Sequence, residues 1–130
     1  MDVIRPDDPA YDDARQAWNL TVDERPAAIA LPGSADEVAE ALQLAAERGL
    51  RVAPQATGHR APALGDLDDT LLLKTERMRG IAIDPERRIA RIEAGVQGAE
   101  LVGQSRRKGL PPSRARGPTS ASLATPPAAA

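Results

Sequence analysis

One stretch of the chain places two apolar runs on either side of an amphipathic segment, and this order restricts the fold more than any other feature. The run "RPAAIALP" at residues 25–32 lies between prolines and is typical of a buried strand. The segment "GSADEVAEALQLAAERGL" then predicts a helix, and "LRVAPQAT" predicts a second strand. Strand, helix and strand with short connections form a βαβ unit, whose strands are parallel and buried.

The helix of this unit has recognisable ends. Ser34 and Glu37 have the spacing of a capping box, in which side chains satisfy free N–H groups at a helix start. Gly49 is placed to end the helix in the left-handed conformation. The residues predicted to form its apolar face are Val38, Ala41, Leu42 and Ala45.

The remaining segments predict further strands and two more helices. "DPAYDDARQAWNL" at residues 8–20 reads as a short helix, and "DTLLLKTERM" as a strand. "GIAIDPERRIARIEAG" predicts a hairpin, with Ile81 and Ile83 on one arm, Ile89 and Ile92 on the other, and a turn at "DPER". A helix starts in "QGAELVGQSRRKG". The fold class is therefore α+β: a small parallel βαβ unit plus additional strands, and a disordered C-terminal tail.

Composition restricts the class of protein. A length of 130 residues makes one domain the default, and the absence of cysteine excludes disulfides and thiolate metal sites. Tyr11 and Trp18 are the only aromatic residues, so the core is expected to be thin for its length. The N-terminal residues contain no signal-peptide h-region, and no run of 18 apolar residues occurs. We therefore expect no membrane partner and a cytoplasmic location.

The only histidine lies in a glycine- and proline-rich loop, "PQATGHRAP" at residues 54–62, directly after the second strand. Gly58 allows a positive φ and the close approach of another group. The successive N–H groups of Ala56, Thr57, Gly58 and His59 are able to form a concavity for an anion, at the strand end where α/β proteins bind ligands. The spacing favours a phosphate cradle only weakly, because an ordinary turn has the same pattern.

No metal site is predicted. His59 has no second histidine, cysteine or carboxylate at the spacing that zinc requires. Asp66, Asp68 and Asp69 in "GDLDD" are clustered but lack the full calcium-loop pattern, which favours solvated loop charges.

The order of these segments resembles the FAD-binding domain of the vanillyl-alcohol oxidase and p-cresol methylhydroxylase superfamily. It looks closest to the bacterial berberine-bridge-enzyme-like oxidoreductases. The resemblance covers about residues 10–102. It rests on the "RPAAI" strand, the "S-x-x-E-V" helix, the "G-H" loop, the "LLL" strand, the "RMRG" step and the "D-P-x-x-R-x-A-R-x-E-x-G" hairpin.

The resemblance implies a cofactor and its site. It implies that FAD is the partner and that its diphosphate lies on the loop formed by Pro54, Gln55, Ala56, Thr57, Gly58 and His59. It also implies a covalent bond between His59 and the 8α-methyl group of the flavin. Arg60 departs from the pattern, because relatives have a small residue there.

Activity is expected only of a full-length form. An enzyme of this type takes a hydride from an alcohol, sugar or amine carbon of a small-molecule substrate. The substrate domain and its catalytic residues are not recognisable in this chain, so the chain alone is expected to be inactive.

The C-terminal part carries a different charge. From Gln104 onward there are five basic residues and no acidic one, whereas residues 1–103 hold the other 12 basic and all 19 acidic residues. Residues 105–127 can be translated back into a string of GC-rich codons. Read from its third base, this string encodes "AAEGLAPLAGSGPDVGVVGYTP", a continuation like those of the family. We therefore predict an FAD-binding subdomain at residues 1–102 and an out-of-frame, disordered tail at residues 103–130. The alternative is a non-catalytic truncated fragment, or a small binding module with a basic tail; no nucleic-acid partner is predicted.

Overall fold

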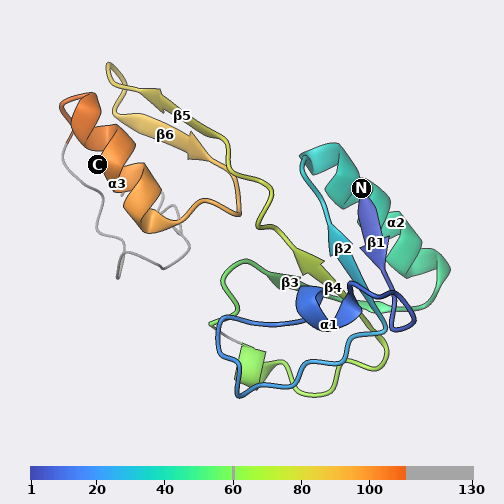
Figure 1. The fold of residues 1–130 in the computed structure, drawn as a ribbon. Coiled ribbons are helices and arrows are strands. Elements are labelled where there is room, and N and C mark those ends of the chain that lie inside the picture. The colour runs from blue at the N-terminus through green and yellow to red at the C-terminus, as the bar shows by residue number, and fades with distance from the viewer. Residues whose placement is uncertain (60, 111–130) are drawn as a thin grey trace. The chain divides into compact units, whose positions relative to one another are not determined.

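The computed structural model describes residues 1–59 and 61–110 and has a mixed α+β fold (Figure 1). Two compact units divide the chain, Met1–Met78 and the residues from Arg79 onward. The first unit contains β1 (Asp2–Ile4), α1 (Tyr11–Ala14), β2 (Ala28–Leu31), α2 (Ala35–Glu47), β3 (Arg51–Gln55), the 3-10 helix η1 (Ala61–Ala63) and β4 (Thr70–Lys74). The second contains β5 (Ile81–Asp84), β6 (Ile89–Ile92) and α3 (Gly98–Arg107). The predicted fold class is confirmed.

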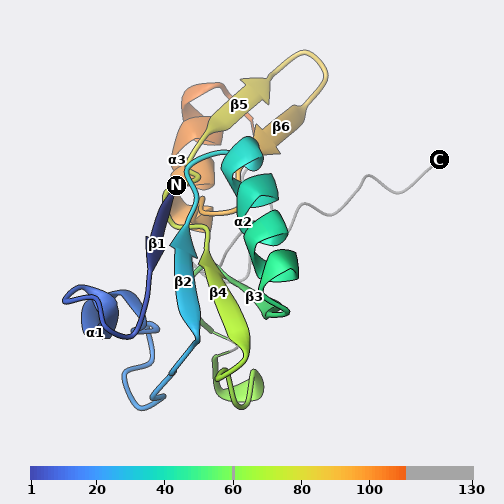
Figure 2. The same cartoon turned by 90° about the vertical axis from the view of Figure 1, so that its right-hand side faces the viewer.

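The sheet of the first unit has the strand order β1-β2-β4-β3. The strands β2 and β3 of the predicted βαβ unit are both parallel to β4, which lies between them (Figure 2). In this register Leu72 lies between Ile29 on one side and Ala53 on the other. The edge strand β1 pairs antiparallel with β2 and was not predicted, because three residues are too short for a periodic signal.

The two faces of this sheet carry two separate apolar clusters, because side chains alternate along each strand. One cluster packs around Leu72 with Tyr11, Ile29, Leu31, Ala53 and Leu67. The other contains Leu71 and Leu73 with alanines of β2 and α2: Ala28, Ala30, Ala41 and Ala45. Helix α2 covers this second face, where the small alanine side chains let helix and sheet approach closely.

The predicted ends of α2 are confirmed, with one shift in the capping pattern. Ser34 Oγ accepts a hydrogen bond from the N–H of Glu37 at 3.2 Å. The Glu37 carboxylate in turn accepts from the N–H of Gly33 at 2.7 Å, one residue before the position that a capping box uses. Gly49 ends the helix with φ of 65°. Leu42 was wrongly placed on the apolar face, since it is 48% exposed and the buried side is formed by Ala41 and Ala45.

The predicted helix at residues 8–20 was too long, because α1 ends at Ala14. The amino group of Lys74 explains the early end. It donates to the carbonyl oxygens of Ala14 at 2.8 Å and Gln16 at 2.9 Å. In a continuing helix the Ala14 carbonyl would instead accept from the N–H of Trp18. The chain beyond Ala14 is thereby held against β4 in a non-helical form.

The second unit contains the predicted hairpin followed by a helix. Strands β5 and β6 are antiparallel, with Ile81 opposite Ile92. Asp84 Oδ1 accepts from two backbone N–H groups of the turn, and Arg88 closes the turn with φ of 56°. Ile89 and Ile92 both lie on β6, the second predicted arm, but Ile89 is 58% exposed whereas Ile92 is partly buried. The odd spacing of these two isoleucines places them on opposite faces of a strand.

Helix α3 continues to Arg107, so the first five residues of the segment predicted as a tail are helical. Arg106 and Arg107 lie in its last turn, where positive charge is favoured by the helix dipole. The predicted disorder of residues 111–130 lies outside the described residues. In the part of the chain that the structure describes, no helix is long and apolar enough to span a bilayer.

Candidate functional site

The loop that contains the only histidine begins at the carboxyl end of β3. Pro54 and Gln55 are the last residues of this strand, and β3 is an edge strand, where a proline without an N–H is tolerated. Beyond the strand, Ala56 and Thr57 are half-buried, Gly58 is buried and His59 is exposed. The loop therefore presents the histidine side chain to solvent from a packed backbone.

Two features of the structure require a glycine at position 58. Its φ is +76°, in the left-handed region that glycine allows. A Cβ atom at this position would lie 3.0 Å from the Cβ of Ala17 and 3.4 Å from the backbone nitrogen of Trp18. The loop thus packs directly against residues 17–18.

The backbone amides of the loop are available to a ligand. Among the hydrogen bonds between described residues, none uses the N–H groups of Ala56, Thr57, Gly58 or His59. The Gly58 carbonyl oxygen accepts from the N–H of Ala61 at 3.0 Å, which closes the loop onto η1. Successive backbone N–H groups around a glycine with positive φ are a feature of the backbone nests that bind anions.

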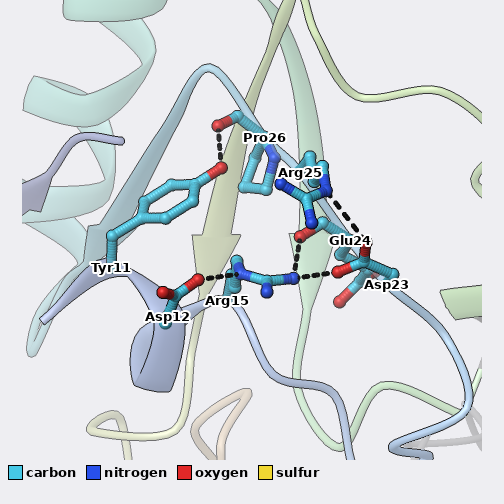
Figure 3. Close-up of polar contacts among 7 residues, drawn as sticks. All are labelled: Tyr11, Asp12, Arg15, Asp23, Glu24, Arg25 and Pro26. Atoms are coloured by element: carbon cyan, nitrogen blue, oxygen red, sulfur yellow. Dashed lines mark hydrogen bonds and ion pairs between the residues drawn. The ribbon is translucent and has the colours of Figure 1, made fainter. Parts of the chain in front are cut away.

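A network of hydrogen bonds joins polar groups of residues 11–26, the segment that includes Ala17 and Trp18 (Figure 3). The Tyr11 hydroxyl donates to the carbonyl oxygen of Pro26 at 2.7 Å. Arg15 donates to Asp12, to Asp23 and, at 3.1 Å, to the carbonyl oxygen of Glu24. Hydrogen bonds from Arg15 and from Arg25 lower the pKa of Asp23.

The same network affects the groups that donate to it. The hydrogen bonds to Asp12 and Asp23 raise the pKa of Arg15, whereas burial raises the pKa of Tyr11. Both side chains therefore keep their protons at neutral pH and hold this segment in place.

Trp18 is the residue of this segment that touches the histidine. Its ring centroid lies 5.8 Å from that of His59, and the two planes are 62° apart. This edge-to-face geometry is a favoured arrangement of aromatic rings.

A buried polar pair lies at the end of β3. Gln55 Nε2 donates to both carboxyl oxygens of Glu24 at 2.9 Å, and both side chains are about 95% buried. The Gln55 Oε1 atom and the neighbouring Thr75 Oγ1 atom are buried without a hydrogen-bond partner among the described residues. The side chain of Gln55 is thus turned into the protein, and its contribution at the loop is to fix the strand end.

The acidic loop behaves as a solvated cluster. Asp69 pairs with Arg51, whose Nε donates at 2.8 Å, and this hydrogen bond lowers the pKa of Asp69. The neighbouring Asp66 raises the pKa of Asp68. Within residues 1–59 and 61–110, no group of three or more histidine, cysteine or acidic side chains is placed to hold a metal ion.

The sequence did not reveal three residues that contribute to this site. Trp18 was placed within the predicted helix at residues 8–20, and neither Glu24 nor Lys74 was singled out. Lys74 is 93% buried by its contacts to the segment before Trp18. The one available signal was charge within otherwise apolar runs, since a lysine follows "LLL" directly and buried lysines are rare without partners.

Comparisons with known proteins identify the class of ligand. The family model described as an FAD binding domain matches residues 26–121. The (R)-6-hydroxynicotine oxidase of Paenarthrobacter nicotinovorans is 32% identical over 109 residues, which is 84% of this chain and 24% of that enzyme. The glucooligosaccharide oxidase of Sarocladium strictum is 32% identical over 107 residues, 78% of this chain and 21% of that enzyme.

Solved structures agree with this assignment. The crystal structure of 6-hydroxy-D-nicotine oxidase from Arthrobacter nicotinovorans superimposes with a TM-score of 0.72 at 32% identity, covering 83% of this chain and 24% of that one. A berberine-bridge-enzyme-like protein of Physcomitrella patens has the same fold, with a TM-score of 0.71 at 24% identity over 82% of this chain and 24% of that one.

The chain spans about a quarter of the length of the curated relatives it matches, and it corresponds to their FAD-binding part. The family match covers most of the chain, and the α+β fold agrees with that of the solved structures. The chain therefore belongs to the FAD-binding domain family of flavin-dependent oxidases of the vanillyl-alcohol oxidase and berberine-bridge-enzyme-like type.

Proposed function

We propose that the loop from Pro54 to His59 holds the diphosphate of FAD. The observation that carries the proposal is the set of N–H groups at residues 56–59, which have no acceptor among the described residues. Gly58, with its positive φ, turns the backbone at this point, and the loop follows the carboxyl end of a parallel strand. A diphosphate carries the negative charge and the acceptor oxygens that such donors bind.

We further propose that His59 forms a covalent bond to the 8α-methyl carbon of the flavin. The bond would replace one C–H bond of the methyl group and the N–H bond of the imidazole; the two protons would go to solvent, and the two electrons would pass by way of the flavin to dioxygen. FAD, when bound, supplies the redox chemistry by accepting a hydride from the substrate. The imidazole of His59 is exposed, and the backbone beside it is fixed by the packing of Gly58 on Ala17. A histidine in this position is able to reach a bound ring while the neighbouring amides hold the phosphates.

We propose the oxidation of an alcohol, sugar or amine carbon as the activity of a protein that contains this domain together with a substrate domain. A small-molecule substrate is expected only in that form. The alternative is a non-catalytic fragment or a small binding module. The cytoplasmic location and the absence of a nucleic-acid partner stay predictions.

The division at residue 102 also stays a proposal. The change of charge after residue 103 and the family-like reading of the shifted frame support it. Helix α3 continues to Arg107 and the family match to residue 121, so neither marks the boundary. The nucleotide sequence tests for a frame slip. If the second reading frame downstream of residue 102 does not encode a glycine-rich continuation of the flavin domain, a frame slip is excluded.

Titration of the purified chain with FAD and with ADP tests the proposed site. ADP carries the diphosphate but no flavin, so both ligands are expected to bind and to compete with each other. Calorimetry and flavin fluorescence provide independent measurements. Failure of both ligands to bind would overturn the proposed function.

Gly58→Ala is expected to weaken FAD binding by about tenfold. An alanine with positive φ is strained by roughly 1–2 kcal/mol, and a tenfold change in affinity corresponds to about 1.4 kcal/mol. The added methyl group would also press on Ala17 at 3.0 Å. The matched control is Gly65→Ala, because Gly65 has a similar φ of +69° but no atom within 4 Å of its Cβ position. Equal affinities for FAD in the two variants would contradict the role of the loop.

His59→Ala is expected to release the flavin. In the unmutated chain loaded with FAD, the flavin should remain with the protein after acid precipitation, because a carbon–nitrogen bond survives unfolding. In the variant the flavin should appear in the supernatant, where its absorbance at about 450 nm is measured. Retention of flavin by both proteins would exclude His59 as the attachment site.

A further inference from the structure

Trp18 presents its indole ring to solvent at a defined place. The residue is 74% exposed, although large aromatic side chains are normally buried for most of their area. Its ring nevertheless lies in edge-to-face contact with His59, at a centroid distance of 5.8 Å. Leu20, on the same segment, is also 74% exposed.

The backbone at Trp18 is fixed on both sides. Residues 17–18 lie against the glycine of the loop, with the Trp18 nitrogen 3.4 Å from the Cβ position of Gly58. Just before them, the carbonyl oxygen of Gln16 accepts from the buried Lys74 at 2.9 Å. Arg15 ties the same segment to the carbonyl oxygen of Glu24 at 3.1 Å. The backbone that carries the indole is therefore held beside the loop.

We infer that Trp18 is a cofactor-binding residue whose indole packs on the isoalloxazine ring of FAD. The inference rests on the proposed function, because the ring is brought to this place by His59 and by the amides of the loop. A planar group joined to the His59 imidazole lies beside the indole of Trp18, because the indole already contacts this imidazole. Covering the indole removes apolar area from water and adds an aromatic contact, both of which favour binding.

The isoalloxazine ring is a better occupant than adenine, the other planar group of FAD. Adenine lies on the far side of the diphosphate from the flavin. With the diphosphate on the amides of residues 56–59, the group next to His59 is the flavin. Trp18 is therefore expected to contribute to the affinity for FAD and not to the affinity for ADP.

Titration of the unmutated full chain, Trp18→Ala and Leu20→Ala with FAD and with ADP tests this assignment. Trp18→Ala should weaken FAD binding by about tenfold, the order expected for one lost aromatic stacking contact. Its affinity for ADP should be unchanged. Leu20→Ala is the matched control, since Leu20 has the same exposure but no recorded contact with His59, and it should leave both affinities unchanged.

A spectroscopic measurement separates ring contact from general packing. An indole in contact with a flavin quenches the flavin emission by electron transfer, and a phenyl ring does so far less. Trp18→Phe should therefore retain most of the FAD affinity while the emission of bound flavin increases.

The outcomes distinguish the two proposals. If the unmutated chain binds neither ligand, the proposed function fails and this inference fails with it. If it binds FAD and Trp18→Ala binds FAD equally well, the inference alone is overturned. A loss of ADP affinity equal to the loss for FAD would also overturn it, because Trp18 would then support the scaffold or adenine. Unchanged flavin emission in Trp18→Phe would exclude direct ring contact.

Discussion

Leu72→Ala is expected to lower the free energy of unfolding by about 3 kcal/mol, within the range of roughly 2–5 kcal/mol for leucine truncation in a core. Leu72 is 0% exposed and lies in the central strand β4, between Ile29 and Ala53. It packs against Tyr11, the one buried aromatic side chain of its cluster. The truncation removes three carbon atoms from this packed cluster and leaves a cavity among its side chains.

Thermal unfolding followed by circular dichroism measures this effect. A loss of about 3 kcal/mol corresponds to a midpoint lower by roughly 15 °C for a domain of this size. Leu42→Ala is the matched control, because Leu42 is 48% exposed on α2 and alanine favours the helix. The control should change stability by less than about 1 kcal/mol. Similar losses in the two variants would contradict the assignment of Leu72 to the core.

Gln55→Leu is expected to destabilise the protein by about 2–3 kcal/mol, because it removes the donor from a buried carboxyl group. The Gln55 amide is the recorded hydrogen-bond partner of both Glu24 oxygens, and Glu24 is only 4% exposed. Removing both polar groups together leaves no unpaired carboxyl group behind. The double variant Glu24→Leu/Gln55→Leu should therefore be more stable than Gln55→Leu alone.

Urea unfolding of the two single variants and the double variant gives the coupling energy between these residues. A double variant whose loss equals the sum of the single losses would show that the pair is not coupled. The same three proteins can be titrated with FAD, because Gln55 ends the strand from which the cofactor loop starts. If the variants lose FAD affinity in proportion to their loss of stability, the pair has a structural role next to the loop.

Much of the first unit was predictable from local patterns. The apolar runs around residues 28–31 and 51–55 became β2 and β3, and the segment between them became α2. Ser34 caps the start of that helix with its hydroxyl group, and Gly49 ends it with a positive φ that a residue without a Cβ atom adopts readily. Gly58 adopts the positive φ that its place in the loop suggested. Each of these predictions depends on residues that are close together in the sequence.

Other features of the site were not predictable, because they depend on contacts between distant residues. Lys74 ends α1 by binding the carbonyl oxygen of Ala14, 60 residues earlier. The Gln55 amide meets Glu24 across 31 residues. Leu42 and Ile89 are large apolar residues of the kind found in cores, yet both are exposed because of the way α2 and β6 are oriented. Periodicity does not contain this information.

The sequence by itself therefore determined the strand, helix and strand of the first unit, and the loop that contains Gly58 and the only histidine. These features depend on backbone preference and side-chain periodicity, which act over a few residues. Tertiary structure alone decided that β4 lies between β2 and β3 and that β1 joins the edge beside β2. It also decided that Trp18 meets His59, although 41 positions separate them in the numbering. These arrangements follow from the burial of apolar faces and the pairing of buried polar groups, whose free energies depend on which distant residues come together.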